Sequence, residues 1–131
     1  MRRSGMKAMI RVEITVRNPR NLKLKADAIF LVDTGADFPA ISRMLMTRLK
    51  IEMLGQTVFN LANGKDVKLD IAYVYLEFGG ERILTMATIA EDEECCIDFN
   101  VLAALKIHID TSELKLLKAF KKRFPRTKIA V

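Results

Sequence analysis

Apolar and polar residues alternate along the first part of the chain. In residues 9–16 (MIRVEITV), Ile and Val fill every second position, and Arg, Glu and Thr stand between them. A period of two with β-branched residues is typical of a β-strand that buries one face. After a turn at 18–21 (NPRN), alternation resumes at 22–27 and passes into the apolar run 28–32 (AIFLV), which stops at Asp33. An apolar run that ends at a turn signal predicts a strand buried on both faces.

A helix that begins with Pro39 is predicted, because Ile41, Leu45 and Leu49 recur every four residues. This spacing places the three apolar side chains on one face of a helix, and proline suits the first helical position. We expect this helix to end near residues 49–51.

A β-hairpin is predicted next. Residues 57–61 and 67–78 are rich in residues that favour strands, and the Asn-Gly pair at 63–64 lies between them. Asn-Gly is a strong turn signal for hairpins. The glycine pair at 79–80 predicts another turn, and residues 82–90 another strand.

The C-terminal third of the pattern is mixed. Residues 97–106 fit a short helix, residues 107–109 a strand, and residues 113–120 either a strand or a helix. Many short strands with one or two small helices indicate a mainly β fold, either a barrel or a sandwich.

Composition limits the class of protein. The chain has 131 residues, of which 50% are hydrophobic and 29% are charged. These values predict one folded domain with a sizeable core and exclude a disordered or collagen-like chain. No apolar run approaches the roughly 20 residues of a membrane helix, and the basic start passes directly into alternation rather than into the apolar core of a secretory signal. We therefore expect a soluble, cytoplasmic protein with no membrane partner.

The net charge of +6 is concentrated at the C-terminus. Residues 1–117 carry equal numbers of basic and acidic side chains, whereas residues 118–131 (KAFKKRFPRTKIAV) carry six basic and no acidic ones. We divide the chain accordingly into a folded domain, 1–117, and a basic tail, 118–131. Such a tail can attract nucleic acid or another anionic surface, but a solvated terminus is the favoured interpretation. The acidic run 91–94 is interpreted as a solvated loop.

Candidate chemistry centres on Asp33-Thr34-Gly35. A carboxylate at the end of a buried strand loses solvation, so its surroundings can adapt it to acid or base catalysis. Gly35 permits a sharp turn, and the Thr34 hydroxyl can hold nearby backbone. Taken alone, the tripeptide fits a simple Asx-type turn better than a catalytic loop.

The other reactive side chains indicate no cofactor. Cys95 and Cys96 are adjacent, which prevents a useful disulfide, and neither has the spaced Cys or His partners of a zinc site. His108, the single histidine, lies between two isoleucines in a strand pattern, which favours a solvent-facing position. We expect neither a metal ion nor a cofactor.

The wider sequence context strengthens the catalytic interpretation. Residues 29–37 (IFLVDTGAD) resemble the active-site segment of the retropepsin-like (retroviral-type) aspartic protease family. The predicted hairpin tip at 62–65 lies where that family carries its flap, and residues 96–102 (CIDFNVL) resemble the segment beside the catalytic loop. The resemblance covers residues 9–117. It implies a small, closed, mainly β barrel of the acid-protease type, with one or two short helices, that forms a symmetric homodimer.

The resemblance also implies an aspartic endopeptidase that hydrolyses peptide bonds. The chain contains one Asp-Thr-Gly, and the family supplies the second carboxylate from a second copy of the chain. Two Asp33 side chains would share one proton: the ionised one takes a proton from the attacking water, and the protonated one hydrogen-bonds the scissile carbonyl oxygen. The implied catalytic residues are Asp33, Thr34 and Gly35, and the implied substrate-binding residues are Ala36, Asp37, Ala62, Asn63, Gly64, Lys65 and Ile97.

One position departs from the family pattern. Asp98 stands where the family has a glycine after two apolar residues. A carboxylate beside the catalytic pair repels its charge and can crowd the loop. Because of Asp98, a catalytically weak retropepsin fold that serves as a dimerisation or peptide-binding module stays open as an alternative. The basic tail leaves a second alternative open, a nucleic-acid-associated protein that acts through residues 118–131.

Overall fold

The described structure is almost entirely β. The computed structural model describes residues 10–33, 36–60, 63–91, 94–110, 115–116 and 129–130. Within these ranges the strands are β1 (Arg11–Asn18), β2 (Asn21–Val32), β3 (Ala40–Ser42), β4 (Gly55–Asn60), β5 (Asp66–Phe78), β6 (Glu81–Ala90), β7 (Cys95–Ile97), β8 (Ile109–Asp110), β9 (Lys115–Leu116) and β10 (Ile129–Ala130). The helices are α1 (Arg43–Arg48) and α2 (Phe99–Ala104).

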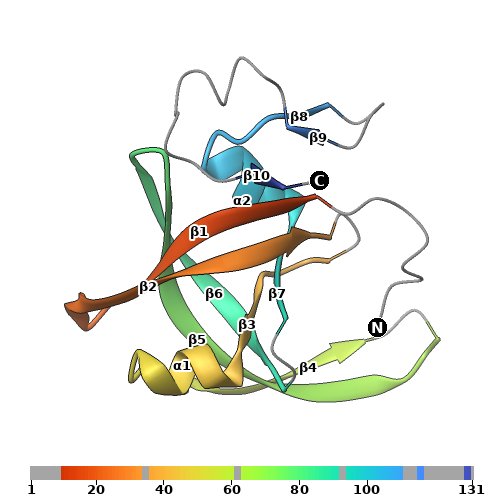
Figure 1. Cartoon of the computed structure of the whole chain (residues 1–131). Coiled ribbons are helices and arrows are strands. Elements are labelled where there is room, and N and C mark those ends of the chain that lie inside the picture. The colour runs from red at the N-terminus through yellow and green to blue at the C-terminus, as the bar shows by residue number, and fades with distance from the viewer. Residues whose placement is uncertain are drawn as a thin grey trace.

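The main sheet closes on itself as a small barrel (Figure 1). Its strand order is β10-β1-β2-β7-β3-β6-β5-β4, and β1 also pairs with β5. That additional pairing joins Thr15, Val16 and Arg17 to Glu77, Leu76 and Tyr75. Closure removes most exposed strand edges. The mainly β barrel expected from the sequence is therefore the observed architecture.

The barrel interior is built from the period-two pattern of the strands. Val12, Ile14 and Val16 on β1 are fully buried, and Val74 and Leu76 on β5 face the same core. Side chains of alternate strand residues point to one side, so this pattern fixes which face of each strand turns inward. Among the described residues, no helix has both the length and the apolar character to cross a membrane.

The predicted helix after Pro39 begins later than its spacing suggested. Residues 40–42 form β3, which pairs in parallel with β6 and meets β7 at Ala40↔Cys96. The helix starts at Arg43, and its first turn is capped by Ser42, whose Oγ accepts a hydrogen bond of 3.2 Å from the Leu45 N–H. Residues 40–42 pair with neighbouring strands of the sheet. This pairing outweighs the helical spacing of Ile41, Leu45 and Leu49.

Two further boundaries differ from the prediction. Ile97 ends a strand rather than beginning a helix, and α2 starts at Phe99 after the N-cap residue Asp98. The strand predicted to be buried on both faces is so at Phe30 and Leu31, whereas Ile29 is 49% exposed. The expected strand 107–109 is found at Ile109–Asp110.

The C-terminal end of the chain contributes a strand to the main sheet. Ile129 and Ala130 pair antiparallel with Val12 and Arg11 of β1. The rest of the basic segment 118–131 lies outside the described residues. The division at residue 117 and the role of the tail stay predictions.

Candidate active site

Asp33 is held by the backbone of a distant segment. It follows β2, which pairs in parallel with β7 through Val32↔Ile97. The Asp33 N–H donates a hydrogen bond of 2.9 Å to the Ile97 carbonyl, and the Val32 N–H donates one of 3.0 Å to the Ile10 carbonyl. Strand partners on both sides therefore fix the end of β2, and the half-buried Asp33 leaves the sheet at a defined point.

A backbone hydrogen bond lies directly beyond the end of β2. The Ala36 N–H donates a hydrogen bond of 3.2 Å to the Asp33 carbonyl, so these two residues lie close together. Ala36 is half-buried and Asp37 is exposed. Thr34 and Gly35 lie outside the described residues, so the roles implied for them stay predictions. Ile97 is fully buried, and its carbonyl, rather than its side chain, reaches the loop.

The predicted hairpin is formed by β4 and β5. The two strands pair antiparallel from Gly55↔Ile71 to Asn60↔Asp66. At the tip, Asn63 Oδ1 accepts a hydrogen bond of 3.0 Å from the Lys65 N–H, and Gly64 has φ +85°. A positive φ suits glycine, which explains the Asn-Gly signal.

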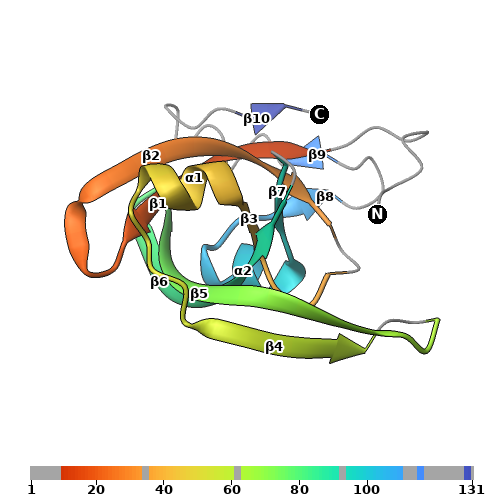
Figure 2. The same ribbon diagram turned by 90° about the horizontal axis from the view of Figure 1, so that it is seen from below.

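The exposed residues Asn63, Gly64 and Lys65 are thus placed at the hairpin end, whereas Ala62 lies outside the described residues. In Figure 2 the hairpin extends on the same side of the barrel as the end of β2. This is the arrangement that a peptide-covering element needs, and the substrate contacts of these residues stay predictions.

An aromatic contact that the sequence did not reveal joins the hairpin to the Asp33 segment. The ring of Phe38, one residue after Asp37, meets the ring of Phe59 on β4 edge-to-face, with centroids 5.5 Å apart. Such a geometry is favourable for two aromatic rings. Phe38, which lies between β2 and β3, and Phe59 on β4 are 21 positions apart, and neither belongs to a periodic pattern, so only the three-dimensional structure reveals the contact.

Asp98 lies beside the candidate catalytic loop, immediately after the Ile97 carbonyl that holds Asp33. Its side chain is 2% exposed, and Oδ2 accepts a hydrogen bond of 3.2 Å from the Asn100 N–H as the N-cap of α2. Oδ1 has no hydrogen-bond partner among the described residues. Burial raises the pKa of the Asp98 carboxyl, and the negative charge of Asp37 raises it further.

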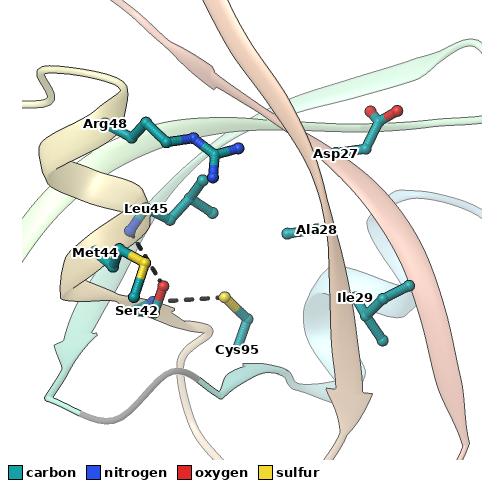
Figure 3. A pocket seen from close by; sticks show the side chains of 8 residues that line it. All are labelled: Asp27, Ala28, Ile29, Ser42, Met44, Leu45, Arg48 and Cys95. Atoms are coloured by element: carbon teal, nitrogen blue, oxygen red, sulfur yellow. Dashed lines mark hydrogen bonds between the residues drawn. The ribbon is translucent and has the colours of Figure 1, made fainter.

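A pocket of about 240 Å³ lies between β2 and α1, away from Asp33 (Figure 3). Arg48 on α1 and Asp27 on β2 stand on opposite sides of it. Within the lining, the Ser42 N–H donates a hydrogen bond of 3.5 Å to Cys95 Sγ. The lining residues are Asp27, Ala28, Ile29, Ser42, Met44, Leu45, Arg48 and Cys95. None of the predicted site residues lines this pocket.

Comparison with solved structures identifies the architecture. The protease of EIAV, complexed with the inhibitor HBY-793, superposes with a TM-score of 0.57 and 18% sequence identity, over 81% of this chain and 95% of that one. The chain has the retropepsin-like fold. A foamy viral protease–reverse transcriptase in complex with an RNA/DNA hybrid also matches, with a TM-score of 0.52 and 12% identity, over 72% of this chain and 12% of that one. No model of a protein family and no curated protein sequence matches the chain.

The retropepsin-like fold confirms the resemblance drawn from residues 29–37 and 96–102. It explains why those two segments, distant in sequence, meet at the Asp33–Ile97 hydrogen bond. At identities below 20%, these likenesses establish the fold, and the reaction has to be argued from the site itself.

Proposed function

We propose that the protein is an aspartic endopeptidase that is active as a homodimer. The observation that carries the proposal is the position of Asp33, half-buried at the end of β2 and held by the Ile97 carbonyl, on the same side of the barrel as the β4–β5 hairpin. A carboxylate placed rigidly below an element that can cover an extended peptide suits hydrolysis of a peptide bond.

The proposed reaction needs two carboxylates, and one chain supplies one Asp-Thr-Gly. In the dimer, two copies of Asp33 hold a water molecule between them. The ionised copy removes a proton as the water oxygen attacks the carbonyl carbon, and the protonated copy donates a hydrogen bond to the carbonyl oxygen. The C–N bond then breaks, and the leaving nitrogen takes up a proton. No metal or cofactor takes part in this scheme.

The hairpin would bind the peptide backbone. Extended peptides add to exposed strand edges through main-chain hydrogen bonds, and a covering hairpin also excludes water from the reacting atoms. Ala36, Asp37 and residues 62–65 are the proposed contacts. Thr34 is proposed to brace the two catalytic loops across the dimer axis.

A structure of the assembled protein tests the proposal. We expect two chains related by a two-fold axis, with carboxyl oxygens of the two Asp33 side chains within hydrogen-bond distance. Copies whose Asp33 side chains face away from each other would reject the mechanism.

A second function is favoured by one observation. The buried Asp98 carboxyl adds a potential negative charge beside Asp37 and the catalytic loop. A protein of this fold that binds peptides or dimerises without efficient cleavage would tolerate such a charge. Peptide binding by the wild-type protein without cleavage, over hours and at several pH values, would favour this function.

A further inference from the structure

Arg43 contacts the hairpin at the residue where it leaves the barrel. From Ile71 onward, β5 pairs with β6, beginning at Ile71↔Thr88. Residues 66–70 of β5 pair with β4 alone. Asp70 is therefore the last residue of the two-stranded part, and it accepts a hydrogen bond of 2.7 Å from Arg43 Nη2. A two-stranded ribbon is marginally stable by itself, so its direction depends on contacts at its base.

The contact is part of a compact network. Arg43 also donates from Nε and Nη2 to the two carboxylate oxygens of Glu91, at 2.9 and 2.6 Å. The other oxygen of Asp70 accepts a hydrogen bond of 3.0 Å from Gln56 Nε2, and Gln56 is the cross-strand partner of Asp70. The planar guanidinium thus links both strands of the hairpin to the end of β6.

The network is anchored on the framework that holds Asp33. Arg43 directly follows β3, and β3 pairs with β6 and, through Ala40↔Cys96, with β7. The same β7 supplies the Ile97 carbonyl that holds Asp33. Figure 1 shows β3 leading directly into α1, and β6 lies beside β3 as its parallel partner. Nearer the hairpin tip, the Phe38–Phe59 ring contact keeps β4 against the segment after Asp33.

We propose that Arg43 is a positioning residue for peptide hydrolysis: through Asp70 and Gln56 it sets the direction of the β4–β5 hairpin relative to Asp33. The inference rests on the proposed function, because the hairpin's direction matters only if a peptide binds beneath it. Small displacements of a positioning element are costly in catalysis.

The first experiment compares Arg43→Gln with wild type and with Arg48→Gln as a matched control. Arg48 lies on the same helix and makes no ion pair within the described residues. We expect Arg43→Gln to lower kcat/KM for a cleaved peptide about tenfold, mainly through KM, and Arg48→Gln to leave it unchanged. Amide hydrogen exchange should accelerate in 55–60 and 66–70 but not in β1 or β6.

The second experiment exchanges the charges. Arg43→Asp places three carboxylates together and should give the largest loss. Adding Asp70→Arg should recover much of the exchange protection and KM, because an arginine at 70 can pair with the new carboxylate and with Glu91. If Arg43→Asp does not fold, Arg43→Gln and the double variant still carry the test.

Unchanged hairpin exchange in Arg43→Gln, or a fall in kcat with KM unchanged, would overturn the positioning role. Failure of the proposed function has a different signature. A wild-type protein that cleaves no peptide rejects the protease, while the exchange data still show whether Arg43 holds the hairpin. Faster exchange in the whole barrel would show that Arg43 is a general stabilising residue and would also overturn the inference.

Discussion

The backbone N–H of Asp33 donates a hydrogen bond of 2.9 Å to the carbonyl of Ile97. This contact joins the end of β2 to the end of β7, and it is followed on one side by the hydrogen bond from Ala36 and on the other by the buried Asp98. The candidate catalytic carboxylate is therefore held by main chain, which does not depend on side-chain rotamers. The pairing of β2 with β7 also brings a second carboxyl group, that of Asp98, close to the loop after Asp33.

Asp33→Asn is expected to abolish peptide cleavage and leave the fold intact, because the amide has the size of the carboxyl group but cannot accept the proton of the attacking water. We expect kcat to fall about 10³-fold or more, in line with the loss of general acid–base catalysis. The measurement is digestion of a peptide mixture by each protein, with the cleavage products quantified over time by mass spectrometry. Asp27→Asn on β2 is the matched control, since an amide oxygen can still accept from Thr15 Oγ1. Cleavage by Asp33→Asn at the wild-type rate would reject the catalytic assignment.

Activity per chain is expected to fall on dilution, because the proposed site exists only when two chains associate. The assay is the initial rate at a series of protein concentrations, with sedimentation at the same concentrations reporting the fraction of dimer. The two curves should coincide. Constant specific activity of a protein that sediments as a single chain would contradict the shared site.

Asp98→Asn is expected to stabilise the protein at pH 7. Burial raises the pKa of Asp98 in the folded state above its unfolded value, so folding favours the protonated form. Its contribution is therefore most favourable below the unfolded pKa of about 3.9 and is lost as pH rises through the folded pKa. Asparagine keeps an N-cap oxygen for Asn100 and cannot ionise, so a gain of about 1 kcal/mol at pH 7 should shrink toward pH 4.

Thermal unfolding of Asp98→Asn at several pH values checks this expectation. Asp98→Ala serves as a control, because it removes the charge and also the cap, and should be less stable than Asp98→Asn by about 1 kcal/mol. If Asp98→Asn is instead less stable than wild type at pH 7, the expectation that the buried carboxyl group costs stability at that pH is contradicted.

Glu77→Gln is expected to lower Tm by a few degrees at pH 7. Glu77 accepts hydrogen bonds from Arg17 at 2.6 and 2.9 Å and from Arg82 at 2.8 Å, which lower the pKa of Glu77. A lowered folded pKa gives stability that is present above the unfolded pKa of about 4.3 and is lost as pH falls through the folded value.

The difference in Tm between Glu77→Gln and wild type should therefore shrink as the pH falls below about 4.3 and vanish once the pH is below the folded pKa of Glu77. Glu52→Gln is the comparison, since the Arg20–Glu52 pair is largely exposed and should contribute little. An equal loss of Tm in both variants would show that the Arg17–Glu77 pairing across β1 and β5 adds no more stability than an exposed ion pair.

The local pattern predicted most of the elements but not their ends. Strand alternation located β1, strand-favouring composition located β5, the glycine pair at 79–80 marked the turn before β6, and the Asn-Gly pair located the hairpin. The start of α1 was wrong by four residues, because Ala40, Ile41 and Ser42 find strand partners on β6 and β7. Glu91, in the acidic run expected to be solvated, is exposed, and its ion pair with Arg43 was not predicted. The start of α1 and this ion pair both depend on partners distant in sequence, which no local period contains.

By itself, the sequence determined the alternation that turns Val12, Ile14 and Val16 inward, and it marked Asp33 as the residue at the end of an apolar strand. The tertiary structure alone decided that Ile97 holds Asp33, that Phe38 meets Phe59, and that Arg43 contacts Asp70 at the base of the hairpin. The physical reason is the distance in sequence between the contacting residues. Side-chain periodicity is set by backbone geometry within one element, whereas these contacts arise when barrel closure brings separate elements together.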